Sequence, residues 1–144
     1  MSKADDILAI VGAANALTRI AAVQTQNEAP AAQWRALKVL EQEGPLRIGA
    51  LATESRTTQP GMTRLVGQMA HEGIVTRGAD PEDSRATVVT ITDAGRDAFA
   101  AWRVQLSTAL EPLFADLDDD EWAVLSRAAR ILTSRTAPVE APSR

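Results

Sequence analysis

Apolar residues recur every three or four positions along most of the chain, a period typical of amphipathic helices. This pattern predicts helices over residues 4–25, 32–43 and roughly 48–54, with breaks at residues 27–30 and at Gly44-Pro45. After Thr92, a good helix cap, it predicts a long helix followed by a last one. Their apolar positions are Phe99, Trp102, Leu106, Leu110, Leu113 and Phe114, then Trp122, Leu125, Ala129 and Leu132.

The pattern changes in the middle of the chain. Residues 58–73 have a capping threonine, a proline in the first turn and a closing glycine, and so predict another helix. Two β-branched runs follow, Ile74–Arg77 and Ala86–Ile91, on either side of the turn Asp80-Pro81-Glu82-Asp83-Ser84-Arg85. A helix sized for the DNA major groove, followed by a hairpin "wing" with an arginine at its tip, indicates a nucleic-acid-binding protein.

Two motifs carry a family resemblance. The hairpin turn at 80–85, followed by Thr92-Asp93-Ala94-Gly95-Arg96, resembles the D-P-x-D-x-R…T-x-x-G-R signature of MarR-type winged-helix regulators. The similarity extends from the first helix to about Thr136. It implies a mainly α fold with a small β-wing, in a single domain over residues 1–136. A winged helix-turn-helix lobe at about 30–92 would be flanked by dimerisation helices at about 4–25 and 93–136.

The resemblance also implies a function. Members of the family are homodimers that bind near-palindromic operators, and many release DNA when a small molecule or an oxidant binds. A ligand-responsive repressor is therefore expected, with double-stranded DNA, a second copy and a small-molecule effector as partners. The apolar stripes of the outer helices fit a two-fold dimer, although they could instead simply cover the core.

Composition narrows the cellular setting. The 144 residues are 45% hydrophobic and 24% charged, and no apolar run approaches the roughly 18 residues of a membrane span. Residues 1–25 do not resemble a signal peptide, so we expect a cytoplasmic protein with no membrane partner. Cysteine is absent, which excludes disulfides and thiol-based oxidant sensing. The Pro/Ala/Ser-rich residues 137–144 are expected to be a disordered tail.

Net charge gives no support for DNA binding. Residues 31–86 contain seven Arg or Lys and seven Asp or Glu, and the whole chain carries −4. A neutral lobe binds phosphate only where its cations are segregated on one surface. The alternative function is therefore a winged-helix module that binds another protein instead of DNA.

The helix after Thr58 supplies most of the predicted DNA contacts. Its first-turn N–H groups suit a phosphate, Gln59 suits adenine, and Arg64 suits guanine or a phosphate. Gly61 would allow close approach to DNA, and Leu65, Val66 and Met69 would face the core. The DNA-binding residues predicted in this helix and its cap are Thr58, Gln59, Pro60, Gly61, Thr63, Arg64 and Gln68. The alternative is a merely solvated helix face.

The wing and the preceding turns add further contacts. Arg85 is predicted to enter the minor groove, with Asp83 shaping the turn through hydrogen bonds. The acids at 80, 82 and 83 would repel phosphate unless they point away or bond Arg77 and Arg85, and the Asp83–Arg85 pair could be only a weak surface contact. Backbone phosphate contacts are assigned to Arg47, Ser55 and Arg56. Arg47 departs from the family, which usually has a capping Ser or Thr there.

Catalysis and metal binding find little support. His71 is the only histidine and fits the C-terminal end of its helix, while the acidic residues 116–121 fit the cap of the last helix. We therefore expect no enzyme activity, no cofactor and no metal site. Effectors in the family often lie between the DNA-binding lobe and the dimerisation helices. The candidate pocket residues are Ala14, Trp34, Phe99 and Trp102, which could equally be core residues. Such a pocket would hold an anion through arginine, or an apolar ligand.

Overall fold

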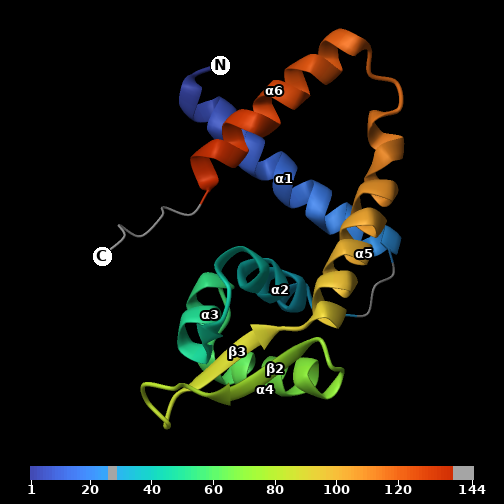
Figure 1. Cartoon of the computed structure of the whole chain (residues 1–144). Coiled ribbons are helices and arrows are strands. Elements are labelled where there is room, and N and C mark those ends of the chain that lie inside the picture. Colours follow the sequence, from blue (N-terminus) through green and yellow to red (C-terminus); the bar gives the residue numbers. More distant parts are fainter. Residues whose placement is uncertain (26–28, 138–144) are drawn as a thin grey trace. The chain divides into compact units, whose positions relative to one another are not determined.

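A computed structural model describes residues 1–25 and 29–137, and the chain divides after Ala109 into two compact units. The first unit contains α1 (Lys3–Thr25), α2 (Ala31–Glu43), β1 (Leu46–Arg47), α3 (Ile48–Glu54), α4 (Gln59–His71), β2 (Val75–Ala79), β3 (Thr87–Ile91) and all but the last residue of α5 (Asp93–Leu110) (Figure 1). The second contains the short 3₁₀ helix η1 (Glu111–Phe114) and α6 (Asp119–Thr136).

The four helices predicted before the hairpin are confirmed to within two residues at each end. The helix after Thr92 is shorter than predicted. Its apolar period continues to Phe114, but α5 ends at Leu110 and η1 follows. Pro112 lies in the first turn of η1, and proline can neither donate the backbone hydrogen bond nor fit the interior of a continuing α-helix.

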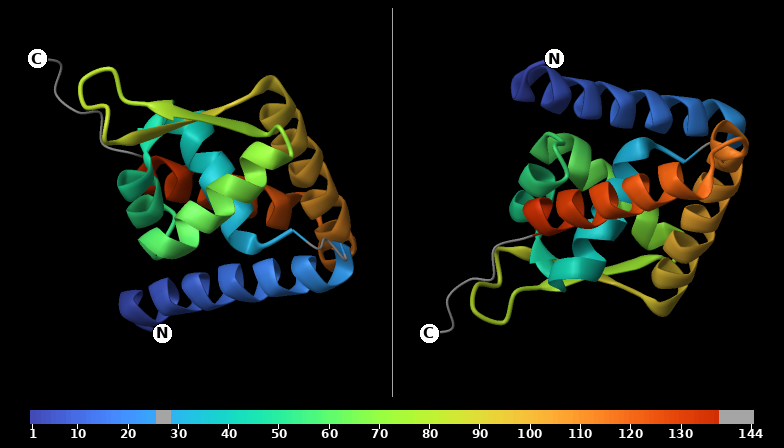
Figure 2. Two further views of the ribbon diagram at one scale, coloured as in Figure 1. Left: turned by 90° about the horizontal axis from the view of Figure 1, so that it is seen from below. Right: turned by 90° about the horizontal axis from the view of Figure 1, so that it is seen from above.

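The sheet has three antiparallel strands in the order β1-β3-β2. The hairpin of β2 and β3 confirms the predicted wing, and its loop projects beyond the helices (Figure 2). The strand β1 was not predicted, because two residues are too short to show alternation. It pairs Arg47 with Val88, on the opposite side of β3 from the pairing of Gly78 with Val88.

The core lies between α2, α3, α4 and the sheet. The buried face of α4 contributes Met62, Leu65, Val66 and Met69, which confirms the predicted core positions Leu65, Val66 and Met69. Val75 and Val89 of the hairpin are buried in the same cluster. The opposite face of α4 is thereby fixed toward solvent.

Thr92 joins the start of α5 to the hairpin. Its hydroxyl accepts the Gly95 N–H at 3.0 Å, as a helix cap does, and donates to the Gly73 carbonyl at 2.7 Å. Its own N–H donates to the Ile74 carbonyl at 3.1 Å. The predicted cap is confirmed, and it fixes the first turn of α5 against the beginning of β2.

The helix α1 has only Ala21 buried. By length and composition it could cross a membrane, since its 23 residues reach a mean hydropathy of 1.5 over 18 positions. The prediction that no segment is this apolar is therefore wrong. A single such helix is weak evidence for a membrane span, and a subunit interface requires the same exposed apolar residues.

In the second unit, Asp118 and Glu121 form a reciprocal cap at the start of α6. The Asp118 carboxylate accepts the Glu121 N–H at 2.8 Å, and the Glu121 carboxylate accepts the Asp118 N–H at 3.3 Å. This confirms the role predicted for the acidic run. Part of the predicted break at 27–30 and all of the predicted tail except Ala137 lie outside the described residues.

Candidate nucleic-acid interface

The solvent face of α4 gathers most of the side chains predicted to contact DNA. Exposed along it are Gln59, Pro60, Thr63, Arg64 and Gln68, with Thr58 at the cap. The Thr58 hydroxyl accepts the Gly61 N–H at 3.1 Å. The Thr63 hydroxyl donates to the Gln59 carbonyl at 3.0 Å, so it faces any ligand with its methyl group and oxygen lone pairs.

The structure explains one of the two glycines of α4. A β-carbon at Gly61 would lie 2.9 Å from the Thr58 hydroxyl, so a larger residue would disturb the cap. The cap therefore gives a structural reason for glycine at position 61, and the predicted role of Gly61 in close approach to DNA stays a separate prediction. A β-carbon at Gly67 would lie at an ordinary 3.5 Å from the Arg77 guanidinium. Arg77 therefore lies beside α4.

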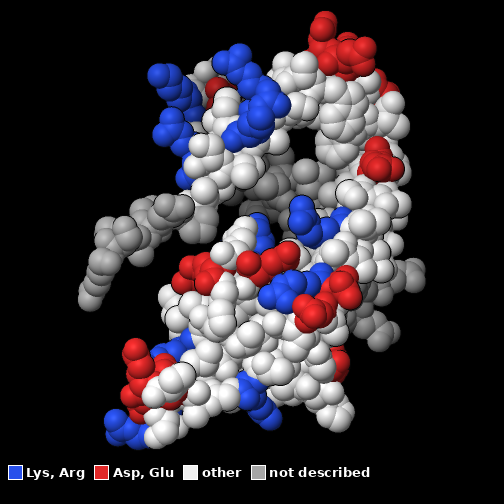
Figure 3. All heavy atoms as spheres, in the orientation of Figure 1, with Lys and Arg blue, Asp and Glu red and all other residues white. Residues whose placement is uncertain are grey.

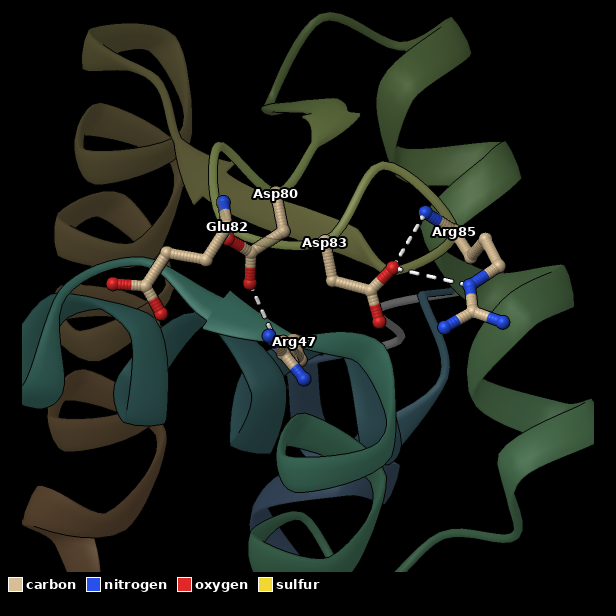
Figure 4. Close-up of polar contacts among 5 residues, drawn as sticks. All are labelled: Arg47, Asp80, Glu82, Asp83 and Arg85. Carbon is tan, nitrogen blue, oxygen red and sulfur yellow. Dashed lines mark hydrogen bonds and ion pairs between the residues drawn. The ribbon is translucent and has the colours of Figure 1, made fainter.

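The wing turn is shaped by its own carboxylates. Asp83 Oδ1 accepts the Arg85 N–H at 3.1 Å and contacts Arg85 Nε at 3.3 Å (Figure 4). The Arg85 side chain is 92% exposed, so it remains accessible at the tip. Asp80 bonds Arg47 and not Arg77, with 2.6 Å between Arg47 Nε and Asp80 Oδ2. The wing thus mixes acids with arginines, as the lower left of Figure 3 shows.

These contacts keep both partners of the Arg47–Asp80 pair ionised. The Glu82 N–H and then the Arg47 guanidinium lower the pKa of Asp80 below its ordinary value. The same hydrogen bond raises the pKa of Arg47. At neutral pH the pair therefore carries no net charge toward a phosphate backbone.

One of the predicted phosphate contacts is wrong, and another lies beside a cleft. Ser55 is completely buried, because it ends α3 inside the lobe, so the predicted contact of Ser55 with DNA is wrong. Its carbonyl accepts a hydrogen bond from Arg35 Nε at 2.9 Å. Arg56 is exposed but adopts a left-handed backbone with φ of 55°, and it lines a cleft formed by α1, α2 and α5.

That cleft has a volume of about 320 Å³ and an aromatic wall. Trp34 and Trp102, both predicted for an effector pocket, stack there with ring centroids 5.1 Å apart. Of the described residues that line it, three are cationic and none is acidic. The lining residues most relevant to binding are Thr18, Trp34, Arg35, Lys38, Arg56 and Trp102.

The other two predicted pocket residues lie elsewhere. Ala14 does not line the cleft; it is exposed one turn of α1 before Thr18, and its carbonyl accepts the Thr18 hydroxyl proton at 3.0 Å. Phe99 is buried behind Trp102, with their rings 5.9 Å apart. Arg35 and Lys38 were missed as pocket residues, because helical spacing alone does not show which polar face of α2 meets α1. Arg56 was missed because it lies in the turn after α3.

Comparisons with known proteins agree with this geometry. The model of the MarR family matches residues 30–87. The uncharacterised HTH-type regulator Mb0904 of Mycobacterium bovis is 33% identical, over 69% of this chain and 70% of the relative. The chain belongs to the MarR family. ML2140 of Mycobacterium leprae is 31% identical over 74% of the chain and 75% of the relative. The repressor IacR of Pseudomonas putida is 33% identical over shorter shares, 44% and 38%.

Solved structures show the same fold. The regulator Tm0710 of Thermotoga maritima superposes with a TM-score of 0.71 at 21% identity, covering 92% of this chain and 94% of that one. Bordetella bronchiseptica BpsR, whose DNA binding is regulated by 6-hydroxynicotinic acid, gives 0.60 at 19% identity over 86% and 89%. As a MarR-family protein, the chain is a DNA-binding transcription regulator without enzymatic activity.

Proposed function

We propose that this MarR-family regulator is a homodimeric, cytoplasmic repressor that binds a near-palindromic operator and responds to a small anionic ligand. The observation that carries the DNA-binding part is the exposed polar face of α4 beside an arginine-tipped wing. In this proposal, two copies of the Gln59–Arg64 segment enter successive major grooves, and each Arg85 enters a flanking minor groove. The assignment as a repressor follows the similarity to IacR, a transcriptional repressor.

A dimer is supported by apolar residues that the single chain leaves exposed. Ile7, Leu8 and Val11 of α1 are exposed, as are Trp122 and Ile131 of α6. Large apolar side chains left exposed on a helix, as on each of these two, are typical of subunit interfaces. A two-fold dimer also supplies the symmetry that a palindromic operator requires.

The α1–α2–α5 cleft supports an anionic aromatic ligand. Stacked tryptophans provide an apolar wall, and Arg35, Lys38 and Arg56 provide positive charge. BpsR supports the same class, since 6-hydroxynicotinic acid is an aromatic carboxylic acid. The link to DNA binding would run through Arg35, which donates to the Ser55 carbonyl at the end of α3. An anion that competes for this guanidinium would weaken a contact that positions the helix-turn-helix.

Ligand binding should be visible in tryptophan fluorescence. Because Trp34 and Trp102 line the cleft, 6-hydroxynicotinate or benzoate should quench a Trp122→Phe variant, which keeps only the cleft tryptophans. Adding Arg35→Ala should weaken the apparent affinity by about tenfold or more, the effect of a lost charge-assisted hydrogen bond. Arg103→Ala, outside this cleft, is the control. Equal quenching of all variants would remove the cleft as the ligand site.

DNA binding itself is tested by selection. The full chain is incubated with a randomised duplex library, and bound sequences are amplified through several rounds. A near-palindromic consensus supports the operator proposal. Failure to enrich any sequence at low salt would favour the alternative, a winged-helix module that binds a protein partner.

Arg64→Ala then asks what this arginine contacts. If Arg64 meets guanine, the variant should lose about 1–3 kcal/mol of binding free energy and tolerate substitutions at one base position. If it meets a phosphate, affinity should fall evenly across operator variants. Fluorescence anisotropy against single-base operator variants separates the two cases. The melting temperature should hardly change, because the side chain is exposed; a large drop would instead assign Arg64 a structural role.

A further inference from the structure

One contact joins the helix-turn-helix to the wing from opposite edges of the sheet. Arg47 ends β1 and precedes α3, whereas Asp80 follows β2. Since β3 lies between β1 and β2, the 2.6 Å bond between Arg47 Nε and Asp80 Oδ2 spans the sheet at the base of the wing (Figure 4). The two residues are 33 positions apart in sequence.

Asp80, whose carboxylate accepts the hydrogen bond from Arg47, is also the first residue of the wing turn. Asp80 Oδ1 accepts the Glu82 N–H at 2.8 Å, and its side chain is only 13% exposed. The Asp80 N–H donates to the Ala86 carbonyl at 3.0 Å, and the Ala86 N–H donates to the Asp83 carbonyl at 2.9 Å. Any shift of Asp80 is therefore passed along the turn to Asp83, which holds the backbone and side chain of Arg85.

Arg47 occupies a capping position but does not cap. It is the residue before α3, and its side chain makes no hydrogen bond to the helix backbone. Instead, its guanidinium faces the wing. Besides Asp80, the nearby charges that act on it are those of Asp83 and Glu82, so it offsets the acidic side of the turn. About half of the Arg47 side chain is exposed to solvent.

We propose that Arg47 is a positioning residue that fixes the wing through Asp80 and thereby sets the reach of Arg85 into the minor groove. This role replaces the predicted role of Arg47 as a simple phosphate contact. It rests on the proposed DNA-binding function. Its consequence is a preference for operator flanks, since a narrow A·T minor groove attracts the inserted arginine.

The two roles of Arg47 make opposite predictions for Asp80→Asn. If Arg47 serves only as a phosphate contact, removing the acid frees the guanidinium and lowers repulsion, so DNA binding should strengthen. If Arg47 positions the wing, the same change should weaken binding. Asn keeps an oxygen that can accept the Glu82 N–H, so the turn itself can be retained. Glu82→Gln is the matched control, because it removes one wing acid without touching the Arg47–Asp80 bond.

The probes are two labelled duplexes with the selected core sequence and either A·T or G·C flanks. Fluorescence anisotropy gives the affinity of the full chain for each. We expect Arg47→Ala and Asp80→Asn each to lose roughly tenfold on A·T flanks, the effect of one hydrogen bond between charged groups, and much less on G·C flanks. Adding Arg85→Ala to either variant should cause little further loss, because all three act through one side chain.

The opposite results would overturn the inference. Tighter DNA binding by Asp80→Asn would make Arg47 a phosphate contact. So would a loss of affinity in Arg47→Ala that is equal on A·T and G·C flanks and adds to the loss caused by Arg85→Ala. In that case the salt dependence of binding should also fall by about one contact in Arg47→Ala. If the wild-type chain selects no DNA at all, it is the proposed function that fails. Circular dichroism melts of each variant exclude loss of folding as the cause.

Discussion

Replacing Gly95 with alanine should destabilise the protein by about 3 kcal/mol or more, at the upper end of what overpacking a core costs. A β-carbon at this position would overlap the Ile74 carbonyl oxygen and lie 2.9 Å from the Ile91 side chain. That carbonyl cannot move away freely, because it accepts the Thr92 N–H. The neighbouring Gly73 carbonyl is held by the Thr92 hydroxyl at 2.7 Å, which fixes the same segment a second time.

The measurement is thermal unfolding at one protein concentration, since a dimer's melting temperature depends on concentration. For a chain of this size the expected loss corresponds to a shift of roughly 10 °C. Gly78→Ala is the matched control, because an added β-carbon there meets open space. If Gly95→Ala melts like Gly78→Ala, the close approach of α5 to the start of β2 is incorrect.

The motif around Gly95 shows how sequence and structure inform each other. Thr92 ahead of an apolar period predicts a helix cap, which is confirmed. The sequence could not show why the fourth position is glycine, because the reason is the carbonyl of Ile74, which precedes β2 and lies far from Gly95 in the sequence. The cap of α6 could be predicted without knowledge of distant segments, since Asp118 and Glu121 are three residues apart and each accepts the other's backbone N–H. Local hydrogen bonds were predictable, whereas contacts between distant segments were not.

In the candidate site, too, features set by local sequence were predictable and contacts between distant segments were not. The exposed and buried faces of α4 follow from helical period, so Arg64 and Leu65 were assigned correctly to solvent and to core. Ser55 was misplaced because the end of α3 shows no period of its own within seven residues. The Arg47–Asp80 bond was also missed. It depends on β1, whose two residues carry no strand pattern.

Raising the salt concentration from 50 to 200 mM should weaken binding to the selected operator by about 10³–10⁵-fold, if the dimer makes the 6–10 phosphate contacts typical of DNA-bound dimers. The formal neutrality of residues 31–86 does not by itself oppose this, because phosphate binding depends on where cations are exposed and not on their sum, and two of the seven acids are held in ion pairs that cancel their own charge. Asp80 is bonded to Arg47, and Asp83 to Arg85. Arg64 and the first-turn N–H groups of α4 are left to meet the backbone.

The slope of log affinity against log salt is the quantity that separates the two candidate functions. Displacement of cations from phosphates makes the slope steep and nearly linear for DNA. Binding to a protein partner displaces no condensed layer of cations, so the affinity should change far less over the same range of salt concentration. A shallow slope on the selected duplex would mean that the exposed cations of the neutral lobe contact few phosphates. The exposed faces of α4 and the wing would then be better explained as a protein-binding surface. A steep slope, together with a smaller one in Arg64→Ala, would place phosphates against α4.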